Sequence, residues 1–159
     1  MMQNGNVYIT RERLVELENE LKELKTLKRK QVADKIAEAR AHGDLSENSE
    51  YDVAREEQAH LEIKIAKLEN ILSRATVVNE SDLPEDEVHI LCTVTIKDLD
   101  SEQETEYKLV SPEEADFEQN KISIVSPIGK ALIKRKINDI VEVNNQNGKK
   151  QYKILKITK

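Results

Sequence analysis

The first half of the chain is almost free of residues that break helices. No proline precedes Pro84, and Gly43 is the only glycine between Gly5 and Gly129. Proline and glycine are the residues that most strongly end or interrupt helical segments. We therefore expect long helices before residue 76, with Gly43 marking the point at which the chain can reverse.

The first predicted helix covers residues 10–42, because apolar residues recur there in steps of three and four. They are Leu14, Leu17, Leu21 and Leu24, and, after a slip of one residue near Leu27, Val32, Ile36 and Ala39. This spacing places the side chains on one helical face. Gly43 supplies the left-handed conformation that commonly follows the last helical turn.

The second predicted helix begins near Ser49, which forms a Ser-x-x-Asp capping pattern with Asp52. Its apolar stripe is a heptad with one polar member, Gln58: Tyr51, Ala54, Gln58, Leu61, Ile65, Leu68 and Leu72. Two long helices joined by a few residues fold back on each other and bury both stripes together. The sequence thus predicts an antiparallel coiled-coil hairpin over residues 1–78.

The period changes after Ala75, and residues 79–159 are predicted to form a small α+β domain. Strands are expected at residues 89–96, 106–110, 121–125, 140–143 and 151–157, where β-branched and apolar residues concentrate. Asn147-Gly148 is a typical hairpin turn between the last two. Ser126-Pro127 predicts a short helix over residues 128–133. The fold class of the whole chain is therefore α+β.

Composition excludes several classes of protein. Charged residues make up 35% of the chain and the net charge is −6, so narrow apolar stripes with broad charged faces are expected rather than one large core. No segment approaches the roughly 20 apolar residues that span a bilayer, and no signal peptide is visible. Cys92 is the single cysteine, which excludes an intrachain disulfide. We expect a cytoplasmic protein with no membrane partner.

Acidic residues mark the predicted reversal between the two helices. Asp44 and Glu47 are three residues apart, and Glu50 continues the spacing. Acids are common in turns and favoured at helix N-termini, so the spacing alone favours an ordinary capped turn. A catalytic or metal-binding role for these acids needs a further argument.

Two long motifs supply that argument. Residues 37–51 read AEARAHGDLSENSEY, and residues 115–123 and 126–133 read ADFEQNKIS and SPIGKALI. Both motifs resemble bacterial GreA-type transcript cleavage factors, and the resemblance extends over roughly residues 8–157. It implies that the C-terminal domain is similar to FK506-binding proteins (an FKBP-like domain) and docks on RNA polymerase.

The resemblance also implies a function. The hairpin would enter the secondary channel of bacterial RNA polymerase and reach the extruded 3′ end of nascent RNA in a backtracked complex. There it would stimulate the polymerase's own cleavage of the transcript, so the chain would be an activator and not itself an enzyme. Asp44 and Glu47 match the family's two essential acids, and would complete a Mg²⁺ site shared with the polymerase active centre. Two carboxylates alone are not expected to bind Mg²⁺ tightly in the free protein.

Residues beside the acids have supporting roles in this interpretation. Arg40 and Arg55 flank the tip of the hairpin, which is the predicted reversal that carries Asp44 and Glu47. Both arginines are expected to contact RNA phosphates, with ordinary surface charge as the alternative. Gly43, Asn48 and Tyr51 are expected to support the tip, although packing is the default role of Tyr51. The basic run of residues 134–136 departs from the family pattern, so no polymerase contact is assigned there. A monomer is expected.

Three other functions remain open from the residues. A protein of the same fold that blocks the channel would need neither Asp44 nor Glu47. A prolyl isomerase with a coiled-coil arm would need an aromatic pocket, and residues 79–159 offer only Tyr107, Phe117 and Tyr152. A purely structural coiled-coil adaptor would tolerate any polar tip.

Overall fold

The structure, a computed structural model, describes residues 5–42 and 49–159. It divides into two compact units: a helical unit, Glu12–Arg74, and a sheet unit that joins Met1–Arg11 with Ala75–Lys159. Within the described ranges, none of the helices combines the length and the apolar character needed to cross a membrane. The combination of a helical hairpin and a mixed sheet confirms the predicted α+β class.

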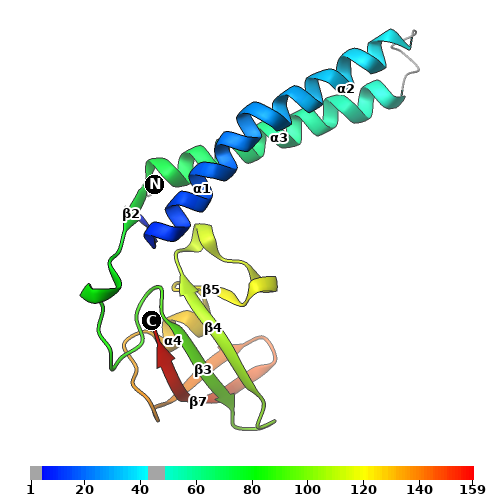
Figure 1. Ribbon diagram of the computed structural model, residues 1–159. Coiled ribbons are helices and arrows are strands. Elements are labelled where there is room, and N and C mark those ends of the chain that lie inside the picture. Colours follow the sequence, from blue (N-terminus) through cyan, green and yellow to red (C-terminus); the bar gives the residue numbers. More distant parts are fainter. Residues whose placement is uncertain (1–4, 43–48) are drawn as a thin grey trace. The chain divides into compact units, whose positions relative to one another are not determined.

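The helical unit consists of two arms. The first arm contains α1 (Arg11–Glu23), a π-helical turn η1 (Leu24–Lys28) and α2 (Arg29–Ala41), and the second arm is α3 (Ser49–Ser73). Figure 1 shows α2 and α3 side by side. The predicted stripes face inward in both arms. Leu17, Leu24, Val32, Ile36 and Ala39 are buried in the first arm, and Ala54, Leu61, Ile65 and Leu68 in the second.

The first arm is not one uninterrupted α-helix, which corrects the prediction for residues 10–42. The π-helical turn occupies Leu24–Lys28, at the place where the apolar pattern slips by one residue. A π-helical turn takes up extra residues in the helix, so Leu24 and Val32 both stay buried although they are eight residues apart. The hydroxyl of Thr26 donates a hydrogen bond of 2.8 Å to the carbonyl oxygen of Lys22.

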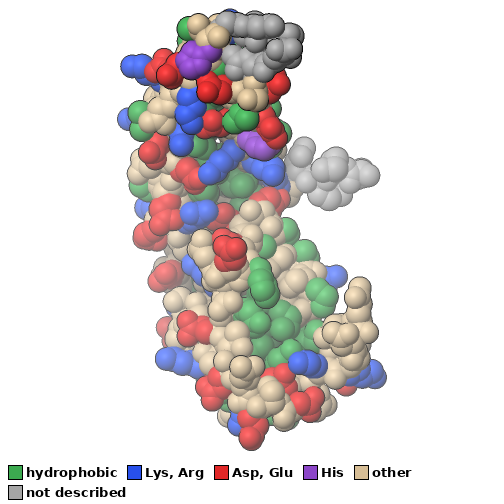
Figure 2. Space-filling view, turned by 90° about the vertical axis from the view of Figure 1, so that its right-hand side faces the viewer, with side chains coloured by type: hydrophobic (Ala, Val, Ile, Leu, Met, Phe, Trp, Pro, Cys, Tyr) green, Lys and Arg blue, Asp and Glu red, His purple; other side chains and the backbone are tan. Residues whose placement is uncertain are grey.

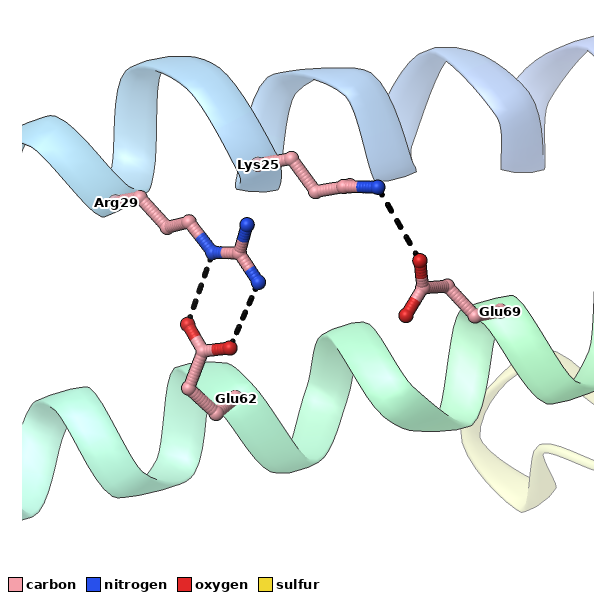
Figure 3. A network of polar contacts seen from close by, with 4 residues as sticks. All are labelled: Lys25, Arg29, Glu62 and Glu69. Atoms are coloured by element: carbon pink, nitrogen blue, oxygen red, sulfur yellow. Dashed lines mark hydrogen bonds and ion pairs between the residues drawn. The ribbon is translucent and has the colours of Figure 1, made fainter.

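Ion pairs connect the two arms on the solvent side of the apolar seam. Figure 3 shows Arg29 pairing with Glu62 through two hydrogen bonds of 3.0 and 2.8 Å, and Lys25 pairing with Glu69 at 3.2 Å. The hydrogen bonds from Arg29 lower the pKa of Glu62. Exposed pairs of this kind contribute little to stability, because water and salt screen the charges and ordering two long side chains costs entropy. The buried seam therefore supplies most of the stability, and the pairs help to fix the register.

The sheet unit is built on a five-stranded sheet of order β5-β4-β3-β7-β6 (Figure 1). Its strands are β3 (Thr93–Asp98), β4 (Glu104–Val110), β5 (Lys121–Ser123), β6 (Ile140–Asn145) and β7 (Gly148–Thr158). All neighbours are antiparallel except β4 and β5. The helix α4 (Pro127–Leu132) contacts β5 and β6. The core contains Val88, Cys92, Val94, Ile96, Leu109, Leu132, Val141 and Ile154.

Two details of this unit differ from the sequence-based expectation. Residues 89–92 are not a strand, because Leu91 adopts a φ of 72° that a strand cannot contain. In addition, β1 (Val7–Ile9) pairs in parallel with β2 (Ala75–Val77). The backbone N–H of Tyr8 donates a hydrogen bond of 2.9 Å to the hydroxyl oxygen of Ser111. These contacts place the segment before α1 in the sheet unit, whereas the boundary expected from the sequence followed residue 78.

Candidate functional site: the hairpin end and a groove in the sheet unit

The hairpin end, defined here as Ala39–His42 of the first arm and residues 49–55 of α3, carries the residues next to the predicted acidic tip. The first arm ends at His42, which has helical dihedral angles, and α3 begins at Ser49. Gly43, Asp44, Glu47 and Asn48 lie outside the residues that the structure describes. Their predicted roles as tip support and as acids therefore stay predictions.

Arg40 and Tyr51 meet across the hairpin end. The guanidinium carbon of Arg40 lies 5.7 Å from the centre of the Tyr51 ring. A hydrogen bond from the Arg40 side chain is the largest cause that lowers the pKa of the Tyr51 phenol, and the charge of Arg55 adds to this effect. All three side chains are thus near one another. Arg40 is thus engaged with a residue of the opposite arm, and the contact with RNA expected for it stays a prediction.

A second cross-arm contact was not predicted from the sequence. His42 Nδ1 lies 3.1 Å from Glu50 Oε2. The two residues are eight apart around a chain reversal, and no helical spacing rule identifies such a pair. A cleft of about 430 Å³ lies beside them between α2 and α3, with Ala39 and Val53 among its lining residues.

The described residues hold no group of three or more His, Cys, Asp or Glu side chains that could bind a metal ion. The predicted cation ligands, Asp44 and Glu47, lie outside the described residues. Two carboxylates suit Mg²⁺, an ion that prefers oxygen ligands and retains several waters.

The sheet unit has an apolar groove that the first residues of the short helix α4 help to line. Its volume is about 480 Å³, and Tyr107, Phe117 and Tyr152 all line it together with Ile122 and Ile128. Figure 2 shows hydrophobic side chains gathered on one face of this unit. The Phe117 side chain is 82% exposed, which is unusual for an aromatic residue. The three aromatic residues of the C-terminal half are thus brought together in one place.

The second sequence motif forms a wall of this groove. Asp116 accepts a hydrogen bond of 3.1 Å from the backbone N–H of Glu118, which fixes the short turn Phe117–Gln119. The hydroxyl of Ser126 donates a hydrogen bond of 2.6 Å to the carbonyl oxygen of Ser123. It also accepts a hydrogen bond of 3.1 Å from the backbone N–H of Gly129. A side chain on Gly129 would collide with the Ser123 carbonyl oxygen. The motif residues therefore fix the backbone that presents the groove.

Comparison with known proteins agrees with both motifs. Residues 7–77 match the family model described as "Transcription elongation factor, N-terminal", and residues 83–159 match "Transcription elongation factor, GreA/GreB, C-term". A two-domain transcription elongation factor is the class of protein that these matches define.

Full-length relatives agree with the two family models. The chain is similar to proteins named transcription elongation factor GreA. The protein from Chloroherpeton thalassium is 51% identical, and the match covers 97% of this chain and 98% of the relative. The protein from Acetivibrio thermocellus is 49% identical, and the match covers 100% of both chains. A third relative of that name, from Thermoanaerobacter pseudethanolicus, is 52% identical, and the match covers 96% of this chain and 98% of the relative. A solved structure titled as that of the transcription factor Gfh1 is 26% identical over 99% of both chains, with a TM-score of 0.49. The chain belongs to the GreA/GreB family of transcription elongation factors.

Proposed function

We propose that this chain stimulates the intrinsic transcript cleavage of bacterial RNA polymerase in backtracked complexes. The observation that carries the proposal is about 50% identity, over nearly the whole chain, to proteins named transcription elongation factor GreA. The resemblance in residues 37–51 adds the two acids of the cleavage-stimulating tip. The chain acts as a monomeric activator in the cytoplasm, and the polymerase remains the enzyme.

The hairpin is the part of the chain suited to reach into a channel. Its two arms are held by a continuous buried seam, which gives a slender element with the predicted acids at its end. In this proposal the hairpin enters the secondary channel and brings Asp44 and Glu47 to the extruded 3′ end of the RNA. Arg55 has no ion-pair partner among the described residues, and its guanidinium is therefore suited to bind an RNA phosphate.

The chemistry requires that the acids act together with a cation, because carboxylates alone repel the phosphate of RNA. Asp44 and Glu47 would hold Mg²⁺ jointly with the polymerase active centre. When bound, the ion supplies a water of lowered pKa and offsets the developing charge on the phosphate. The side chains of this protein contribute the two carboxylates, their orientation and a nearby arginine.

The apolar groove of the sheet unit is suited to docking on the polymerase. An exposed Phe117 and two tyrosines in a groove of about 480 Å³ resemble the aromatic anchors that dominate protein interfaces. Docking there would raise the local concentration of the hairpin at its channel. The groove is therefore the proposed polymerase-binding surface of the chain.

The test is a cleavage assay on stalled, backtracked elongation complexes, with and without the protein. We expect the shortened transcript to appear faster and synthesis to resume from the new 3′ end. If the protein instead slowed synthesis and produced no new cleavage, it would be a channel-blocking inhibitor, and the proposal would fail.

A further inference from the structure

Ser111 lies at the start of a short turn but does not use its side chain to cap that turn. It stands between β4 and the 3₁₀ turn η3 (Pro112–Glu114). A serine before such a turn commonly accepts a hydrogen bond from one of the first backbone N–H groups. Ser126 does so in the same unit, because it accepts 3.1 Å from the N–H of Gly129. Ser111 makes no such bond to η3, a turn that is described in full. Its hydroxyl is therefore free to serve another group.

The hydroxyl of Ser111 instead accepts a hydrogen bond from the N-terminal strand. The donor is the backbone N–H of Tyr8, in the middle of β1, at 2.9 Å from Ser111 Oγ. Ser111 is only 1% exposed, so water has little access to replace the hydroxyl as acceptor. A buried N–H that loses its acceptor is costly, because it has given up water without gaining a partner. A single oxygen atom therefore controls this contact.

The strand pair that Ser111 contacts is a small sheet of its own. Among the described residues, β1 and β2 form a two-stranded sheet that is separate from the five-stranded sheet. The N–H of Val78 extends the pair by donating 2.9 Å to the carbonyl oxygen of Ile9. Backbone hydrogen bonds thus hold β1 to β2, whereas β1 meets the rest of the sheet unit through the Ser111 hydroxyl and through contact with η3.

Both arms of the hairpin begin at this strand pair. Thr10 alone separates the end of β1 from the start of α1, and Arg74 alone separates the end of α3 from the start of β2. Connections of one residue contain few soft dihedral angles, so the arms follow the strands closely. Ser111 also lies four residues before Ala115, which lines the apolar groove. One short segment of chain therefore connects the groove to the strands from which the arms begin.

We propose that Ser111 is a positioning residue, whose hydroxyl anchors β1 to the sheet unit and so fixes the origin of both arms of the hairpin. Its effect on transcript cleavage rests on the proposed function, whereas the anchoring does not. Loss of the hydroxyl should release the strand pair and leave the five-stranded sheet and its groove intact.

The first test is hydrogen exchange at the Tyr8 amide, which reports local opening of the contact. Ser111→Ala removes the acceptor, and the unpaired buried donor should make this amide exchange about tenfold faster or more. Ser111→Thr keeps a hydroxyl and should restore slow exchange. The matched control is Ser101→Ala, because Ser101 Oγ accepts 3.2 Å from the N–H of Gln103 at the opposite end of β4. It should leave the Tyr8 amide unchanged.

The second test is the distance between two spin labels within the sheet unit, introduced with Asn6→Cys and Asn144→Cys. Both positions are exposed and belong to this unit, and the native Cys92 is buried and should stay unlabelled. We expect one narrow distance distribution in the protein that keeps Ser111. Ser111→Ala should broaden the distribution, because β1 is released, and Ser111→Thr should keep it narrow.

The third test is the cleavage assay on backtracked complexes. A misplacement of about 1 Å at a reacting centre can cost about a hundredfold, so Ser111→Ala should lower the maximal rate by about tenfold or more. The protein concentration that gives half of this rate should stay unchanged, because the groove is untouched. Ser111→Thr should restore the rate, which a loss of general stability would not predict.

Unchanged Tyr8 exchange together with an unchanged distance distribution in Ser111→Ala would overturn the anchor. Faster exchange throughout β3 and β7 would also overturn it, because Ser111 would then support the whole fold. A released strand pair with an unaltered cleavage rate would overturn the positioning role. If the protein with Ser111 gave no stimulated cleavage, the proposed function would fail, and the exchange and distance measurements would still decide whether Ser111 is an anchor.

Discussion

Asp98 shows how single residues stabilise the sheet unit. Asp98 lies at the end of β3, and its side chain is 11% exposed. It accepts hydrogen bonds from the backbone N–H groups of Asp100 (2.8 Å) and Ser101 (3.3 Å) and from Lys150 Nζ (3.2 Å). The backbone hydrogen bond from Asp100 is the largest cause that lowers the pKa of Asp98. The charged form is therefore the one that the fold stabilises.

This environment predicts the direction of a pH effect on stability. Because the pKa of Asp98 is lower in the folded protein than in the unfolded chain, its stabilising contribution is complete above its ordinary pKa of about 4 and is lost as the pH falls through the folded value. Asp98→Asn should lower the melting temperature at pH 7. The gap between the variant and the unaltered protein should shrink in thermal unfolding below about pH 4. A gap that stays the same at every pH would contradict this assignment.

At the residue scale, the sequence located the hairpin end but not its contacts. Spacing indicated that Arg40, Tyr51 and Arg55 flank the tip. It did not indicate that Arg40 lies over Tyr51 or that His42 meets Glu50, since such pairs depend on how two helix ends approach across a reversal. The roles of Asp44 and Glu47 are still predictions, because both lie outside the described residues.

At the element scale, the apolar periodicity predicted both arms and also marked the place of an irregularity. The slip near Leu27 corresponds to the π-helical turn Leu24–Lys28, although the slip alone did not identify the type of turn. Short strands were harder to predict. The three residues of β1 become a strand through pairing with β2, which lies more than 60 residues away in the sequence. Similarly, periodicity could not reveal the left-handed Leu91 that excludes a strand at residues 89–92.

The length of the hairpin provides a prediction at this scale. Deletion of residues 29–35 together with 57–63 removes one heptad from each arm. It also removes both partners of the Arg29–Glu62 and Lys35–Glu57 pairs, so neither of these two pairs leaves a charge without its partner. The tip should retract by about 10 Å at 1.5 Å per residue, and bonds to Mg²⁺ are only about 2 Å long. We expect a folded hairpin that binds polymerase but does not promote cleavage.

Circular dichroism and a polymerase-binding assay would check the shortened protein alongside the cleavage assay. Full cleavage activity in a shortened but helical protein would argue against direct delivery of the acids. It would favour an effect exerted through docking alone.

At the scale of the whole molecule, the chain carries two separate surfaces, the hairpin end in the helical unit and the groove in the sheet unit. We assign binding to the groove and chemistry to the hairpin end. Phe117→Ser should therefore raise the protein concentration that gives half of the maximal cleavage rate, with the maximal rate unchanged, because docking sets the local concentration of the tip. Ile140→Ser is the matched control, since Ile140 is also exposed (55%) in the same unit but does not line the groove.

A titration of cleavage rate against protein concentration separates these outcomes. Equal effects of Phe117→Ser and Ile140→Ser, or a lower maximal rate with unchanged half-saturation for Phe117→Ser, would show that the groove is not the docking surface.

The central claim is that Asp44 and Glu47 take part in the chemistry while the rest of the chain delivers them. The most direct measurement is the cleavage rate of a backtracked complex with the double variant Asp44→Asn, Glu47→Gln at low Mg²⁺ concentration, together with its ability to compete with the unaltered protein for polymerase. Removing charge at a metal ligand affects the reacting state more than docking. We predict full competition with a cleavage rate close to that of polymerase alone. Cleavage at the rate of the unaltered protein would contradict the account.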